Sequence, residues 1–388
     1  MGMLRLYLAL AVVLDHVMGL FDPSGTALFG FRTLSGSPAV ETFFAISGFY
    51  MGLILNKKYI GPGSTHTFYV NRFTRIYPIY WAITGGWLLF ELLRYFFTGH
   101  SGPLLPWTDF ASTLHPGTLL LLSGVNFSIV GLDATYFLHF TDLHGALAWG
   151  DPYHWPSIRT LPAVSDFCLN PPAWSISLEL LFYLLAPFLA RRPVWQIALV
   201  AAISFGLKLW LLFVLKLGIP YTYRFFPSEL HVFLLGILAY RCQSWFALER
   251  RDSKWLFGLV ILYGIGTVIL PFTIGVEHPL IRVAAGFLFT LISVAMLPIL
   301  FHLFSRKHWD IAIGELSYPV YLVHWLLRMP LLSVAAYLGL SASAGILLAV
   351  FMSVIAAYLL NRFLIEPIEG WRAAYYKRRQ ALREIPTA

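Results

Sequence analysis

Two ionisable side chains, Arg5 and His16, lie within one apolar stretch, residues 4–20. Ionisable groups at membrane depth cost about 2.5–3.5 kcal/mol each on insertion scales, so they usually face a cavity and have a function. In a helix the two positions lie about three turns, or about 16 Å, apart on one face. The stretch therefore predicts a cation near one membrane surface and an imidazole, the usual general base near neutral pH, near mid-depth. Asp15 is adjacent in sequence and faces elsewhere on the helix.

A second pattern is a polar stripe within the apolar residues 171–187. Ser175, Glu179 and Tyr183 recur at positions i, i+4 and i+8, so they share one face of the predicted helix. Glu179 has two interpretations. It is either a structural ion-pair partner for another helix, or a functional carboxylate that orients an imidazole or binds a sugar hydroxyl.

Arg72 and Arg75 are spaced i, i+3 in residues 65–76 and share a helical face at the predicted cytoplasmic surface. One interpretation is positive charge that fixes topology. The other is an anion clamp, because the planar guanidinium fork suits phosphates. A cytoplasmic donor that carries phosphate groups needs such a clamp.

Ser47 and Gly48 interrupt the apolar residues 41–55. The pair permits a close approach between helices or a local break. A serine nucleophile is conceivable here, but the G-x-S-x-G pattern of a nucleophile elbow is absent.

Secondary site candidates lie in two later segments. His324 and Glu315 lie in residues 313–325, where Pro319 predicts a kinked span. Arg224 and Glu229 lie near the predicted outer mouth, where they could bind an acceptor.

The composition is that of a membrane protein. The chain has 388 residues, of which 58% are hydrophobic and only 12% charged, whereas soluble domains have about 25% charged residues. Apolar length predicts about ten transmembrane helices in a single all-α polytopic bundle covering residues 1–388. The predicted spans are 4–20, 39–55, 76–97, 173–190, 194–216, 228–241, 255–273, 281–304, 311–330 and 342–364.

The basic residues predict the orientation of this bundle. With ten spans and an inside N-terminus, the basic clusters between spans fall on the cytoplasmic side, together with both termini. These clusters are Lys57, Lys58, Arg72 and Arg75; Arg191 and Arg192; Arg241, Arg250, Arg251 and Lys254; and Arg306 and Lys307. Residues 98–172 then form one long extracytoplasmic loop, in which the apolar run 118–130 is re-entrant or lies over the site. The basic aromatic tail after residue 370 is typical of a topology signal that is attracted to anionic lipid heads.

Six motifs in order resemble the acyltransferase-3 family of integral membrane O-acyltransferases, over nearly the whole chain. They are Arg5 with His16, the Ser-Gly-Phe turn at Ser47, the Arg-x-x-Arg element at Arg72 and Arg75, the pattern that carries Trp174, Ser175, Glu179 and Tyr183, the late Ser-Tyr-Pro segment with Tyr318, and the closing Glu-Pro at 366–367.

This resemblance implies transfer of an acyl group, usually acetyl, from cytoplasmic acyl-CoA to a hydroxyl of an envelope or exported glycan. No cofactor is expected to be bound permanently, because acyl-CoA is a co-substrate, and no metal is assigned. His16 and Glu179 are assigned to catalysis, and Arg5, Arg72 and Arg75 to donor binding. The acceptor side or its support is assigned to Ser47, Trp174, Ser175, Tyr183, Tyr318 and His324.

The expected partners and location follow from the same resemblance. The partners are membrane lipids, acyl-CoA, a glycan or glycolipid acceptor, and proteins of polysaccharide biosynthesis or export, with no nucleic acid. The expected location is the bacterial inner membrane.

Two other function classes stay open. A transporter or flippase of a lipid-linked saccharide would also have ten spans and buried polar residues. It should show an inverted repeat, and none is visible. A sensor whose loop histidines bind metal is the third class, although those histidines lack ligand spacing.

Overall fold

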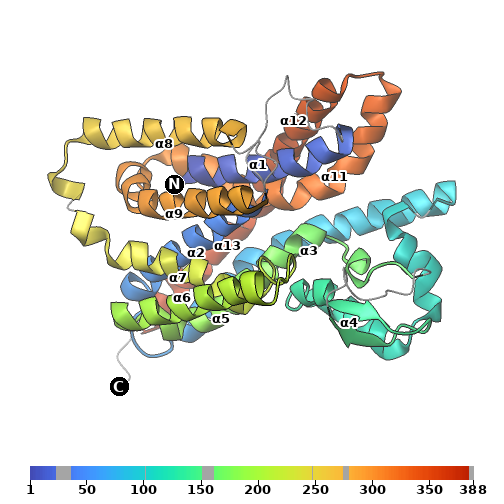
Figure 1. Ribbon diagram of the computed structural model, residues 1–388, viewed down its shortest axis with the longest axis horizontal. Helices are drawn as coiled ribbons and strands as arrows, with labels where there is room; N and C mark the ends of the chain where they lie inside the picture. Colours follow the sequence, from blue (N-terminus) through green and yellow to red (C-terminus); the bar gives the residue numbers. More distant parts are fainter. Residues whose placement is uncertain (23–35, 101, 151–160, 247, 274–278, 384–388) are drawn as a thin grey trace.

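The chain folds into a bundle of helices that lie side by side (Figure 1). The computed structural model describes residues 1–22, 36–100, 102–150, 161–246, 248–273 and 279–383. Its helices are α1 Gly2–Phe21, α2 Gly36–Lys57, α3 Ser64–Thr98, α4 Pro116–Ser128, α5 Trp174–Leu189, α6 Val194–Leu209, α7 Phe226–Arg241, α8 Ser253–Thr273, α9 Pro279–Phe304, α10 His308–Glu315, α11 Ser317–Tyr337, α12 Ala342–Leu360 and α13 Glu366–Arg383. The described strands are β1 Leu138–Phe140 and β2 Leu147–Trp149, an antiparallel hairpin. The predicted all-α class is confirmed.

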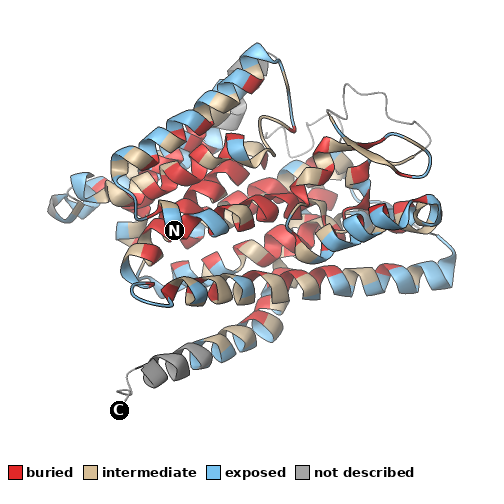
Figure 2. Cartoon of the chain, turned by 90° about the horizontal axis from the view of Figure 1, so that it is seen from below, coloured by how far each residue is buried: buried red, intermediate tan, exposed pale blue. Residues whose placement is uncertain are grey.

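Eight helical segments of the described chain are long and apolar enough to cross a membrane. Side chains between the helices are buried, whereas large apolar side chains on the outer faces are exposed (Figure 2). A helix can expose such a face in lipid, where its backbone groups are satisfied internally. The polytopic bundle is therefore confirmed, while the count of ten spans and the cytoplasmic termini stay predictions.

The segment between α3 and α5 lies at the opposite end of the bundle from the start of α1 (Figure 1). Its helix α4 has 13 residues, or about 20 Å, and is too short for a hydrocarbon core of about 30 Å. Three side chains of α3 satisfy the last carbonyls of α4: Tyr77 donates to Ser128, Tyr80 to Asn126 and Trp81 to Phe127. These bonds fix α4 against α3, and its predicted re-entrant position stays a prediction.

Helices α2 and α7 cross with their backbones in contact. A Cβ atom added to Gly48 would lie 1.9 Å from the carbonyl oxygen of Phe233, and one added to Gly236 would lie 1.9 Å from that of Ala45. Only glycine fits at such a crossing, as in the small-residue interfaces of membrane helices. The close approach predicted at Ser47-Gly48 is confirmed, and it fixes Ser47 at the centre of the bundle.

Two further features position the site. Residues 65–76 and the span that follows them form one continuous helix, α3, so Arg72 and Arg75 extend directly from a membrane segment. The predicted kinked span is instead two helices, α10 and α11, which meet at Leu316. Pro319 lies in the first turn of α11, where its missing N–H costs no helical hydrogen bond.

Candidate active site

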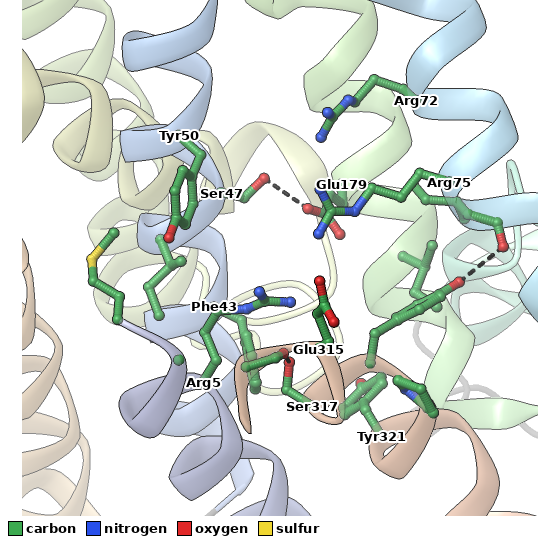
Figure 3. A pocket seen from close by; sticks show the side chains of 18 of the residues that line it. Arg5, Phe43, Ser47, Tyr50, Arg72, Arg75, Glu179, Glu315, Ser317 and Tyr321 are labelled. Atoms are coloured by element: carbon green, nitrogen blue, oxygen red, sulfur yellow. Dashed lines mark hydrogen bonds between the residues drawn. The ribbon is translucent and has the colours of Figure 1, made fainter. Parts of the chain in front are cut away.

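A cavity of about 500 Å³ lies between helices α1, α2, α3, α5, α9, α10, α11 and α13 (Figure 3). Nine of the residues predicted from the sequence line it. They are Arg5, Ser47, Arg72, Arg75, Ser175, Glu179, Tyr183, Glu315 and Tyr318. The other predicted residues, which lie outside this lining, are His16, Trp174, Arg224, Glu229 and His324.

The predicted donor-binding arginines meet at this cavity. The guanidinium groups of Arg5 and Arg75 point into it from opposite walls (Figure 3). Arg72 stacks over the Tyr183 ring at 5.6 Å, and its Nε atom is buried without a hydrogen-bond partner. Within the described chain none of the three forms an ion pair. Four acidic residues, Glu179, Asp310, Glu315 and Glu369, line the same cavity, so its charges are mixed. Because the three arginines form no ion pair with these acids, their guanidinium groups keep N–H donors available for another acceptor.

A hydroxyl–carboxylate network joins α2 to α5 beside these arginines. Ser47 Oγ donates a hydrogen bond of 2.7 Å to Glu179 Oε1, and the Tyr183 hydroxyl donates to the same oxygen. The sequence predicts the stripe of Ser175, Glu179 and Tyr183, and all three line the cavity. Glu179 therefore bonds to hydroxyl groups of the protein and forms none of the ion pairs of the described chain, so the ion-pair interpretation is not supported. Its predicted contact with an imidazole or a sugar hydroxyl stays a prediction.

His16 and His324 form a direct pair. His16 Nδ1 lies 2.9 Å from His324 Nε2, and the two ring planes are within 5° of parallel. The ring centroids are 5.2 Å apart, which exceeds the N···N distance by about the two ring radii. The rings therefore meet edge to edge in one plane, as a hydrogen bond requires, rather than face to face.

This pair fixes the tautomers of both neutral rings. His324 Nδ1 lies 3.3 Å from the carbonyl oxygen of Val320, which can only accept, so Nδ1 carries the proton. His324 Nε2 is then an acceptor, and His16 Nδ1 must donate to it. The lone pair of His16 is therefore on Nε2, as a general base or nucleophile needs.

Tyr321 lies between the cavity and this pair. It lines the cavity, shares a 2.7 Å hydrogen bond with Ser175, and its ring lies 6.0 Å from that of His324. The sequence motifs omitted Tyr321. Its spacing of three residues from both Tyr318 and His324, on one helical face, is the signal that could have found it.

Other polar residues lie apart from the expected acceptor site. Trp174 packs under the guanidinium of Arg224, which also lies 3.7 Å from the ring centre of Tyr136. Glu229, expected at an outer mouth, is instead fully buried, and its carboxylate pairs with Lys208 at 2.7 Å. The acceptor-binding interpretation of Glu229 is therefore wrong, because its carboxylate is sealed inside the bundle.

The loop histidines were the basis of the metal-binding interpretation. In the described part of the chain no group of three or more His, Cys, Asp or Glu side chains could hold a metal ion. His154 and Asp151 of this loop lie outside the described residues.

Comparison with known proteins identifies the family. The family model described as an acyltransferase domain, of the acyltransferase-3 family, matches residues 1–362. The chain belongs to the acyltransferase-3 family. It is similar to acyltransferase MdmB of Streptomyces mycarofaciens, with 28% identity over 351 residues, which cover 83% of this chain and 77% of that protein. No solved structure matches the chain. An acyltransferase of this family with apolar helices of spanning length is an integral membrane protein.

Proposed function

We propose that the protein moves an acyl group, most simply acetyl, from cytoplasmic acyl-CoA to a hydroxyl of an envelope or exported glycan. The observation that carries the proposal is the cavity in which Arg5, Arg72 and Arg75 have no acidic partner in the described chain. Coenzyme A carries several phosphate groups, which would pair with these three guanidinium groups. Guanidinium forks bind such groups through paired, charge-assisted hydrogen bonds.

In the proposed binding mode, the donor's phosphates lie at Arg72 and Arg75, with Arg5 on the opposite wall. Its thioester end then points toward Tyr321 and Ser175. His16 lies about 16 Å further along α1 than Arg5. Acyl transfer in this arrangement requires the Ser175–Tyr321 contact to open, so that the thioester reaches the histidine pair.

In the proposed reaction, His16 Nε2 removes the proton of the acceptor hydroxyl while the oxygen attacks the thioester carbonyl. The new C–O bond forms, the C–S bond breaks, and the CoA thiolate leaves and takes up a proton. His324 is a positioning residue, since it accepts from His16 Nδ1 and keeps the lone pair on Nε2. Glu179 stays assigned to the catalytic cavity, where it orients the hydroxyl groups of Ser47 and Tyr183.

The test compares His16→Ala with the unaltered protein at equal membrane levels. Envelope glycans of producing cells are analysed for the added mass of one acetyl group, and purified protein is assayed for CoA release from acetyl-CoA. General-base catalysis is worth roughly 10²–10⁴-fold, so acylation should fall by that factor. Normal acylation by His16→Ala would overturn the assignment of the base.

A second pair of variants isolates the role of His324. His324→Ala removes the acceptor of the His16 proton, whereas His324→Gln offers a side-chain oxygen that can accept it. We expect His324→Gln to retain more activity than His324→Ala, with the donor KM unchanged in both. A transporter of lipid-linked saccharides needs no CoA, so failure of the unaltered protein to bind CoA would favour that function instead.

A further inference from the structure

Helix α13 closes one side of the cavity, although it lies beyond the part of the chain that matches the family. The family match ends at residue 362, and α13 spans Glu366–Arg383. Its first turns supply Glu369 and Arg372 to the cavity lining, next to Ile365 of the preceding turn. A tail that the sequence suggested was a topology signal therefore forms part of the site.

Arg372 is held in the cavity wall with part of its hydrogen-bonding capacity unused. Its side chain is only 14% exposed, and Nη2 pairs with Glu369 Oε2 one turn earlier on the helix. Nη1 is buried and has no hydrogen-bond partner. A guanidinium has five N–H donors in a fixed fork, so one carboxylate oxygen leaves most of them for another acceptor.

The surrounding charge favours an anionic acceptor. Arg372 lies within electrostatic range of Arg75, as do Arg5 and Arg72. The cavity therefore presents four guanidinium groups from α1, α3 and α13 beside four carboxyl groups, of which Asp310 pairs with the N-terminus and Glu369 with Arg372. Four converging guanidinium groups with unused N–H donors match a ligand with several phosphates.

Arg362, in the turn before α13, forms an exposed ion pair that serves as a comparison for Arg372. Arg362 pairs with Glu366 at i, i+4, but the two side chains are 63% and 45% exposed and neither lines the cavity. Exposed pairs of this kind contribute little. Arg372 differs because its guanidinium is buried in the wall of an anion-binding cavity.

We propose that Arg372 is a fourth donor-binding residue, and that Glu369 holds its guanidinium in place until a phosphate of acyl-CoA replaces the carboxylate. This inference rests on the proposed function, since it assumes a phosphate-bearing donor. It assigns to α13 a direct role in donor affinity. The exchange is of ion-pair partners only, with no covalent step.

The test measures binding of coenzyme A to the purified full-length protein in lipid nanodiscs by calorimetry. The variants are Arg372→Ala, Arg372→Lys and Glu369→Gln, with Arg362→Ala as the matched control. We expect Arg372→Ala to weaken binding about tenfold or more, Arg372→Lys to weaken it less, and Arg362→Ala to stay within about twofold of the unaltered protein. Glu369→Gln should bind CoA more tightly, because the competing carboxylate charge is gone.

Thermal unfolding and binding of pantetheine, which lacks phosphates, show whether the variants are folded. The inference is overturned if the unaltered protein binds CoA and Arg372→Ala binds it equally well. It is also overturned if Glu369→Gln binds as weakly as Arg372→Ala, because Glu369 would then be a structural anchor and not a competitor. Failure of the unaltered protein to bind CoA would instead reject the proposed function.

Discussion

Two groups of charges lie inside the bundle, and they are balanced in opposite ways. In the triad of Lys208, Glu41 and Glu229, the Lys208 Nζ atom lies 2.7 Å from a carboxylate oxygen of each acid. In the cavity, Arg5 and Arg75 face each other without an ion pair in the described chain. A charge removed from water must be compensated. The triad is compensated by ion pairs within the protein, whereas Arg5 and Arg75 line a cavity with several acids and pair with none of them.

The triad also has a position that suits a structural role. It joins α2, α6 and α7, and Thr290 of α9 adds a hydrogen bond of 3.2 Å to Glu41. Helix α2 carries Ser47 into the cavity. The paired charges therefore hold the helix that presents part of the unpaired site.

The largest expected effect is on stability, at Lys208. The substitution Lys208→Ala leaves two carboxylates buried without a cation, and breaking a buried pair in this way costs about 3–5 kcal/mol. Thermal unfolding of the purified protein checks this loss. As a control, Lys208→Met combined with Glu41→Gln and Glu229→Gln removes all the charges and should cost much less. Equal losses in the two proteins would contradict the electrostatic explanation.

The second largest loss of stability is expected at the crossing of α2 and α7, and its cause is steric. The substitution Gly48→Ala puts a Cβ atom against the backbone oxygen of Phe233, so we expect a loss of about 1–3 kcal/mol from overpacking. Gly206→Ala on α6, where a Cβ atom meets nothing within 4 Å, is the matched control and should be neutral or stabilising. Unfolding midpoints that fall equally in both variants would argue against a close crossing.

A smaller change in the free energy of unfolding, and of opposite sign, is expected when Arg75 is replaced. The substitution Arg75→Gln relieves repulsion from Arg72 at i, i+3, which is worth about 0.2–0.5 kcal/mol. The unfolding midpoint without ligand should therefore stay the same or rise, while affinity for CoA falls. A loss of stability as large as that of Lys208→Ala would show that Arg75 has a structural partner.

The smallest effect is expected at Asp142, a charge in water that serves as a reference for the two buried groups. Its carboxylate accepts the backbone N–H groups of Ala146 and His144 at 2.9 Å, and these bonds hold its pKa below the ordinary 3.8. Because the pKa of Asp142 is lower in the folded state than in the unfolded state, the ionised carboxylate stabilises the fold above pH 3.8. This stabilisation is lost as the pH falls through the pKa of the folded state. Asp142→Asn should therefore unfold at a slightly lower temperature at pH 6, and the difference should shrink toward pH 3. A difference that does not change with pH would reject this account.

Sequence patterns predicted the individual elements of the site well. Ser175, Glu179 and Tyr183 share a cavity-facing stripe because four-residue spacing fixes one helical face whatever packs against it. Gly48 marked a close crossing because no other residue lets backbones meet. The pairing of His16 with His324 was beyond such patterns, since the two are 308 positions apart and only the packing of α1 on α11 brings them together.

The sequence by itself determined that this chain is a membrane bundle, which residues share a helical face, and to which family it belongs. These properties follow from local periodicity and from ordered motifs. Only the tertiary structure decided that Arg372 lines the cavity with the other arginines, that Tyr321 lies against both the cavity and His324, and that Glu229 is paired with Lys208. Each of these depends on which helices pack together, and that choice is made by steric fit and charge balance over the whole bundle.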